Sequence, residues 1–164
     1  MKFILVPIDF SAATPLVVNQ AANLAGILRA HVILLYVVHV PKFPSATAEF
    51  GGRAELVDAL EIAGERQLFD LKADLIRRGV NAHSLRLTGN PGTEIVDQAR
   101  KLDPLCIVMG SHGHNALYDL VVGSTVSAVL KRALCPVVVV PVRSAADRTK
   151  FVRLRRRIAS AVKS

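Results

Sequence analysis

The sequence predicts an α/β fold: a single doubly wound, five-stranded parallel sheet with helices on both of its faces. Two observations support this class. Aliphatic runs without polar alternation recur along the chain, and such runs are typical of strands buried on both faces. Segments with a helical spacing of apolar residues separate these runs. Of the 164 residues 51% are hydrophobic and none is Trp, so we expect one domain with an aliphatic core.

Five segments carry the strand signal, of which the third is the weakest. The predicted strands are Phe3–Ile8, Val32–Val38, Ala82–Thr88, Leu105–Met109 and Val137–Val142. A helical segment follows each of the first four strands. This pattern predicts successive βα units, which build a parallel sheet.

The first helix is expected soon after the first strand. Its apolar positions are Val17, Ala21, Leu24 and Leu28, at spacings of four, three and four residues. Ser11 or Thr14 is the candidate N-cap, and Pro15 suits the first turn.

The second helix carries a longer apolar stripe, which consists of Val57, Leu60, Gly64, Leu68, Leu71 and Leu75. Asp74 and Arg78 are placed to pair at i,i+4, and Gly79 is the expected C-terminal stop. A third helix is predicted over Pro91–Leu102 and a fourth over Ser124–Leu134. Residues 39–53, with two prolines and two glycines, form a long loop before the second helix.

Right-handed crossovers leave only a few strand orders. We favour 3-2-1-4-5 over 2-1-3-4-5. In the favoured order the winding reverses between strands 1 and 4, and ligands bind at the carboxyl ends of the strands beside such a switch point. Asp9 directly follows strand 1, and Gly110 directly follows strand 4. The sequence therefore predicts a site between these two strand ends.

The net charge of +8 is concentrated near the C-terminus. Eight of the 21 Lys and Arg residues, but one of the 13 acidic residues, lie in residues 143–164. We therefore divide the chain into a globular domain, 1–142, and a basic tail, 143–164. Apolar residues of the tail recur at helical spacing, so it could form an amphipathic helix for an anionic membrane or a protein partner, or stay solvated. Nucleic acid is not favoured as a partner, because no recognition module accompanies the basic residues.

The remaining composition predicts a cytoplasmic protein. No apolar run approaches the roughly 18 residues of a membrane span, and Asp9 interrupts the short apolar N-terminus. Cys106 and Cys135 both lie in apolar contexts, so we expect reduced thiols, with a redox pair or a metal site as the alternative.

The stretch from Gly110 to Thr125 has the elements of a phosphate cradle. Gly110 and Gly113 allow close backbone approach after a buried strand. Ser124 and Thr125 open a helix whose first N–H groups lack intrahelical acceptors, and such a helix end attracts anions. Other phosphate and hydrolase motifs are absent, because the chain contains neither GxxxxGK[ST] nor GxGxxG nor GxSxG.

This stretch carries a resemblance to a known family. Gly110-Ser-His-Gly113, nine residues, then Gly123-Ser124 gives G-x2-G-x9-G-[S/T]. The pattern resembles the signature of the adenine-nucleotide-binding branch of the universal stress protein family. The segments "ILVPIDFS", "VILLYVV" and "CPVVVVP" are similar to that family at matching places. The resemblance covers residues 1 to about 142.

The resemblance implies a role for nine residues. Asp9 would meet the nucleoside beside Pro7, and the backbone of Val37 would pair with the adenine edge. Met109 and Gly110 would line the ribose and phosphate side. The phosphate-holding positions would be Gly113, Gly123, Ser124 and Thr125, the last of which is often aliphatic in the family. Family members that hold ATP can bridge its phosphates with a divalent metal, so Mg²⁺ is implied as well.

The predicted function is therefore that of a binding protein. We expect an ATP-binding, nucleotide-responsive regulator or stress-survival factor, with at most slow hydrolysis, because no Lys or Arg lies between Gly110 and Thr125. A slow ATPase or phosphotransferase and a nucleotide-free scaffold acting through its tail are the alternatives. His112 and His114 are candidate metal ligands, but no third ligand is placed by spacing. The family and the uncharged edge strand Val137–Val142 both predict a homodimer.

Overall fold

A computed structural model describes residues 1–39, 52–111 and 123–141, and of residues 52–60 it describes the helix backbone alone. Several predictions from the sequence fall outside these ranges. They concern His112, Gly113, His114, most of the loop 39–53, residue 142 and the basic tail 143–164. None of the helices in the described ranges is long and apolar enough to cross a membrane.

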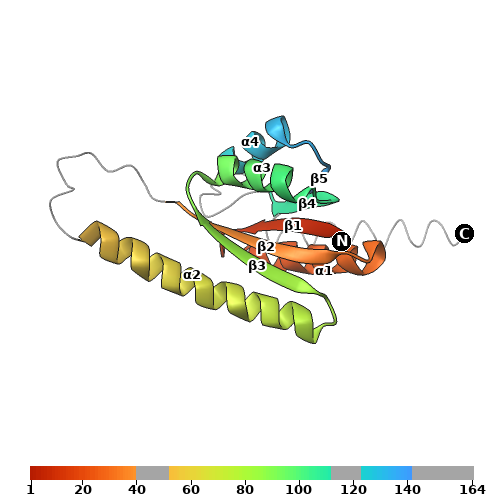
Figure 1. Cartoon of the computed structure of the whole chain (residues 1–164), viewed down its shortest axis with the longest axis horizontal. Coiled ribbons are helices and arrows are strands. Elements are labelled where there is room, and N and C mark those ends of the chain that lie inside the picture. The colour runs from red at the N-terminus through yellow and green to blue at the C-terminus, as the bar shows by residue number, and fades with distance from the viewer. Residues whose placement is uncertain (40–51, 112–122, 142–164) are drawn as a thin grey trace, which may run out of the picture.

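The described chain folds into five parallel strands and four helices (Figure 1). The strands are β1 (Phe3–Ile8), β2 (His31–Val38), β3 (Ala82–Thr88), β4 (Cys106–Gly110) and β5 (Val137–Val140). The helices are α1 (Thr14–Leu28), α2 (Gly52–Arg77), α3 (Pro91–Leu102) and α4 (Ser124–Arg132). The sheet order is β3-β2-β1-β4-β5, which confirms the favoured topology over its alternative.

Alternating strand residues build two apolar layers. Ile4, Val6, Leu34 and Val108 point to the face covered by α1 and α2. Leu5, Leu35, Ile107 and Met109 point to the face covered by α3 and α4. All eight are buried, so the sheet is covered on both sides, as uninterrupted aliphatic runs require.

The N-cap of α1 is Ala13, so the prediction of Ser11 or Thr14 was wrong. Ser11 instead holds the turn before the helix. Its side-chain oxygen accepts the N–H of Ala13 at 3.3 Å, and its carbonyl accepts the N–H of Thr14 at 3.0 Å. Pro15 lies in the first turn, as predicted.

The fourth helix ends at Arg132, two residues earlier than predicted. Ala133 is extended, with ψ of 140°, because the chain must leave the helix to enter β5. Pro136 contributes, since the residue before a proline is disfavoured in helical conformation. β5 is described to Val140, and the last predicted residue of that strand, Val142, lies outside the described ranges.

Helix α2 follows its predicted pattern from Gly64 onward. Gly64, Leu68 and Leu75 are buried against the sheet, and Arg78 contacts Asp74 at 3.5 Å. Gly79 follows with φ of +78°, a left-handed conformation that favours glycine. The side chains of Val57 and Leu60 are not among those described.

Candidate functional site

The sheet is incompletely paired at its switch point. β1 and β4 are registered at Ile4 with Cys106 and at Leu5 with Ile107, and no further pair is recorded between these two described strands. The neighbouring β1–β2 ladder, in contrast, continues to Ile8. The registered pairing between β1 and β4 therefore stops before the carboxyl ends of the two strands, at the place where doubly wound folds bind ligands.

The two halves of the glycine motif meet at the end of β4. The Gly123 N–H donates to the carbonyl oxygen of Ser111 at 3.1 Å, across twelve positions of sequence. The Ser111 N–H donates in turn to the carbonyl of Val140 at 2.9 Å. These two bonds fix the start of α4 directly beside the carboxyl ends of β4 and β5.

The N-terminus of α4 presents backbone donors at this place. Gly123 is the N-cap, with φ of −54° and ψ of 151°, and no side chain caps the helix in the described part of the chain. The first bond from within the helix to the cap joins the Ser127 N–H to the Gly123 carbonyl at 2.9 Å. The earlier N–H groups, at Ser124, Thr125 and Val126, therefore have no intrahelical acceptor and can bind an anion.

The tip of β1 is held in a tight bend by Asp9. One carboxylate oxygen of Asp9 accepts the Ser11 N–H at 3.0 Å. Between them, Phe10 has φ of +57°, a conformation that non-glycine residues rarely adopt and that is common at functional sites. The bend turns the chain away from the sheet immediately after Ile8, at the switch point.

Tyr36 also belongs to this region, and it was not predicted from the sequence. Its ring packs on Phe10 with centroids 4.7 Å apart and lies directly over Gly64 of α2. Burial, and then the negative charge of Asp9, raise the pKa of the Tyr36 hydroxyl above its ordinary value. The signal in the sequence was a lone hydroxyl-bearing residue within the aliphatic run of the second strand.

Replacing Asp9 by Asn should lower the pKa of Tyr36, because the carboxylate that disfavours the phenolate is removed. Alkaline titration of phenolate absorbance measures this, and Tyr36→Phe assigns the signal, since the chain has two tyrosines. A raised pKa in the folded state contributes stability below the ordinary tyrosine pKa, and this contribution is lost as pH rises through the folded value. An unchanged pKa of Tyr36 in the Asn variant would show that the two groups do not interact.

The carbonyl of Val37 lies at the same edge. The His31 N–H donates to Lys2 of the β1 side, and the Val32 N–H donates to Asn81 of the β3 side. Because backbone groups alternate in direction along a strand, the odd-numbered residue Val37 directs its carbonyl toward β1. The β1–β2 ladder ends one residue earlier, at Tyr36, so this carbonyl lies beyond the last registered pair.

The structure brings most of the predicted site residues to one end of the sheet. Asp9 follows β1, Val37 lies near the end of β2, Gly110 ends β4, and Gly123 precedes α4. Pro7 is half-buried, whereas Met109 and Val37 are buried, so the last two would meet a ligand chiefly through their backbones.

The predicted metal ligands are not tested by the structure. Gly113, His112 and His114 lie outside the described residues. Within the described ranges, no group of three His, Cys, Asp or Glu side chains is placed to hold a metal. Cys106 is buried and Cys135 half-buried, and both are free thiols whose pKa values burial raises.

Comparison with known proteins gives one family. The sequence model of the universal stress protein family matches residues 1–141. Universal stress protein MJ0531 of Methanocaldococcus jannaschii is 36% identical over 140 residues, which cover 85% of this chain and 81% of that protein.

Solved structures share the fold. Universal stress protein UspA from Lactobacillus plantarum has a TM-score of 0.77 at 29% identity, covering 85% of this chain and 97% of that one. A universal stress protein from Archaeoglobus fulgidus, solved in complex with dAMP, has a TM-score of 0.64 at 22% identity. It covers 85% of this chain and 97% of its own.

Proposed function

The chain belongs to the universal stress protein family, and from this membership and the geometry of the switch point we propose that it binds ATP as a nucleotide-responsive regulator. The observation that carries the proposal is the bond from Gly123 to Ser111, which sets the uncapped N-terminus of α4 beside the end of β4. A helix start of this kind binds phosphate through backbone N–H groups.

The proposed contacts divide between the two ends of the ligand. The phosphates lie against Gly123, Ser124 and Thr125, together with Gly113 from the glycine motif. The nucleoside lies toward β1 and β2, where the Val37 carbonyl can accept a hydrogen bond from the adenine amino group. Asp9 can accept a bond from the ribose or the base beside Pro7, and Met109 and Gly110 form the floor between the two ends.

The dAMP complex of the Archaeoglobus fulgidus protein supports the proposal that a protein with this fold can bind an adenine nucleotide. That protein is similar in fold alone, but it carries an adenine mononucleotide on the same architecture. Eight of the nine proposed positions lie at or near strand ends or at a helix N-terminus, and Gly113 lies outside the described residues. In doubly wound folds ligands bind at the strand ends beside the switch point, which supports the proposal.

Mg²⁺ would be brought in with the phosphates. The hydroxyls of Ser124 and Thr125 are the oxygen donors at the phosphate end, and oxygen is the ligand that this ion prefers. When bound, Mg²⁺ would neutralise phosphate charge. A slow ATPase is the second candidate function. The glycine motif supports the binding of the nucleotide but supplies no group for its hydrolysis.

We also propose a homodimer through β5. This strand is the last in the sheet order, and all four of its residues are only half-buried. An apolar edge strand of this kind can pair with its counterpart in a second copy.

The Asp9→Asn variant tests whether Asp9 contacts the nucleoside and not the phosphates. Asn keeps an oxygen for the Ser11 N–H but removes the charge, so the bend should survive. We expect ATP affinity to fall about tenfold, as for the loss of one charged hydrogen bond, while affinity for inorganic triphosphate stays the same.

Isothermal titration of both ligands measures this, with Tyr36→Phe as the control for effects on the neighbouring packing. Equal losses for ATP and triphosphate would contradict the nucleoside role of Asp9. No measurable ATP binding by the wild-type protein would contradict the proposed function itself.

A further inference from the structure

Helix α2 carries a row of large apolar side chains on its outer surface. Ile62, Phe69 and Ile76 are 69%, 64% and 52% exposed. They recur every seven residues, which places them on one line along the helix, within about 20° of Phe69 on either side. The buried face of α2, at Gly64, Leu68 and Leu75, is directed elsewhere, so this row takes no part in the core. We call these three residues the α2 row.

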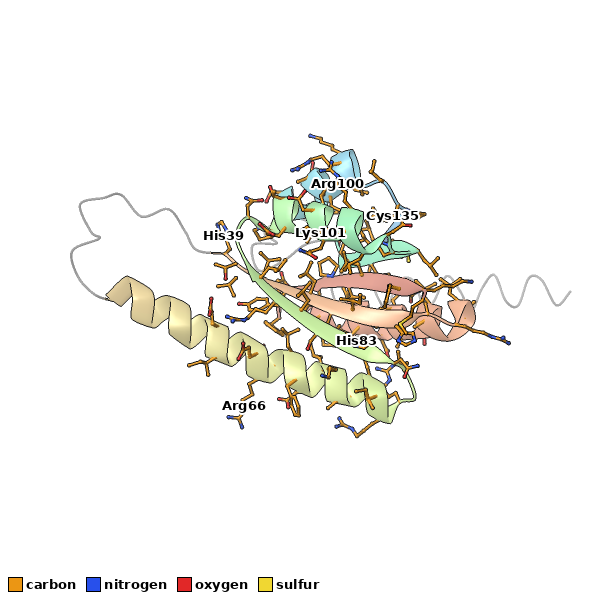
Figure 2. The ribbon with its side chains drawn as sticks, in the orientation of Figure 1. His39, Arg66, His83, Arg100, Lys101 and Cys135 are labelled. Atoms are coloured by element: carbon orange, nitrogen blue, oxygen red, sulfur yellow. The ribbon has the colours of Figure 1, made fainter. Side chains whose placement is uncertain are left out.

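The row lies on a side of α2 that the described elements of the chain leave exposed. α2 packs on β2 and β3 at one side of the molecule, and α3 and α4 lie on the other face of the sheet (Figure 1). Figure 2 shows Arg66, which lies between Ile62 and Phe69 in sequence, pointing away from the sheet. A line of exposed large apolar residues along one helix is distinctive, because exposed apolar residues are ordinarily scattered singly.

The spacing of the row makes it complementary to itself. If two α2 helices pair antiparallel about a twofold axis at Phe69, each Ile62 lies opposite Ile76 of the second copy, and the two Phe69 rings meet at the centre. Such a pairing is isologous, and it closes with two copies.

The charges beside the row match in the same arrangement. On the helical wheel, Glu65 and Lys72 lie on one flank of the row, and the twofold axis sets Glu65 of one copy beside Lys72 of the other. Glu65 is 60% exposed and keeps one carboxylate oxygen at 3.1 Å from Arg86, which fixes its position. On the other flank, Arg66 lies over Ala73 of the second copy. Neither of these two pairs therefore brings like charges together.

We propose that the α2 row is a second self-association surface, through which α2 of one copy pairs antiparallel with α2 of another. This surface is separate from the β5 edge, because α2 packs on β2 and β3, and β3 and β5 are at opposite ends of the sheet order. A protomer with two twofold surfaces assembles into a closed tetramer or an open chain, whereas one with the α2 row alone forms a dimer.

Sedimentation equilibrium of the full chain tests the proposal. One helix pair gives an interface at the small end of the known range, so we expect a dissociation constant on the order of 10 µM. Phe69→Glu should weaken this step at least about 30-fold, because it places two like charges on the axis and removes the central aromatic contact. The mass of the assembly should then fall to that of the dimer formed through β5, or to that of the monomer if β5 does not pair. Lys72→Glu should act in the same direction by opposing Glu65.

Ile27→Glu is the matched control, since Ile27 is 77% exposed on α1 and lies outside the row. The register is tested by mixing Ile62→Cys protein with Ile76→Cys protein and adding a short bismaleimide. The mixture should give more cross-linked pairs than either variant alone, with the wild-type protein as the background for Cys106 and Cys135.

Two results would overturn the proposal. One is a wild-type mass equal to that of Phe69→Glu at every concentration. The other is a Phe69→Glu effect without any gain of cross-linking in the mixture, which would mean that something else, such as the basic tail, occupies the row.

Discussion

Gly123→Val should lower the affinity for ATP by about 100-fold or more. The branched valine side chain at the helix start would cover the N–H groups that are proposed to hold phosphate. The backbone should tolerate the change. Gly123 has φ of −54° and ψ of 151°, which any L-residue adopts, so its backbone conformation does not require glycine.

The comparison of ligands makes this prediction specific. Affinity for inorganic triphosphate should fall together with affinity for ATP, in contrast to Asp9→Asn, which should spare triphosphate. Thermal unfolding should show a melting temperature close to that of the wild type, and Gly26→Val, at the far end of α1, should leave both affinities unchanged. Undiminished ATP binding by Gly123→Val would mean that the helix start is not the phosphate site.

The parts of the fold that depend on burial patterns were predictable from the sequence. Buried parallel strands need apolar residues at every position, and the runs in β1 and β2 show this directly. The handedness of crossovers limited the strand order to a few possibilities, and the favoured one is the observed order. The place of the candidate site was then predicted from the favoured order, because Asp9 follows β1 and Gly110 ends β4 at the reversal.

The parts that depend on three-dimensional contacts were not predictable. Ser11 has the chemistry of an N-cap, but it holds the preceding turn, and Ala13 occupies the cap. The packing of Tyr36 over Gly64 joins residues 28 positions apart, and no local pattern indicates it. The row on α2 was missed for a similar reason, because only the structure shows which face of a helix is already covered.

Two glycine-to-alanine changes in helices should have opposite effects on the free energy of unfolding. A Cβ at Gly64 would lie 2.2 Å from Cε1 of Tyr36, a distance at which something must move. The ring has little freedom, because Phe10 packs against it at 4.7 Å and α2 covers it. A Cβ at Gly26 of α1 would meet nothing within 4 Å.

We therefore expect Gly64→Ala to destabilise the protein by about 2 kcal/mol, the usual cost of overpacking a core. Gly26→Ala should stabilise it by roughly 0.5–1 kcal/mol, because alanine is the better helix former. Urea unfolding of the two variants and the wild type measures both values. Because the two changes add the same methyl group to a helix, helix propensity alone would stabilise both variants. A stabilising Gly64→Ala would therefore mean that Tyr36 does not lie over α2. Destabilisation by Gly64→Ala together with stabilisation by Gly26→Ala would place the Tyr36 ring, which adjoins Asp9, against α2.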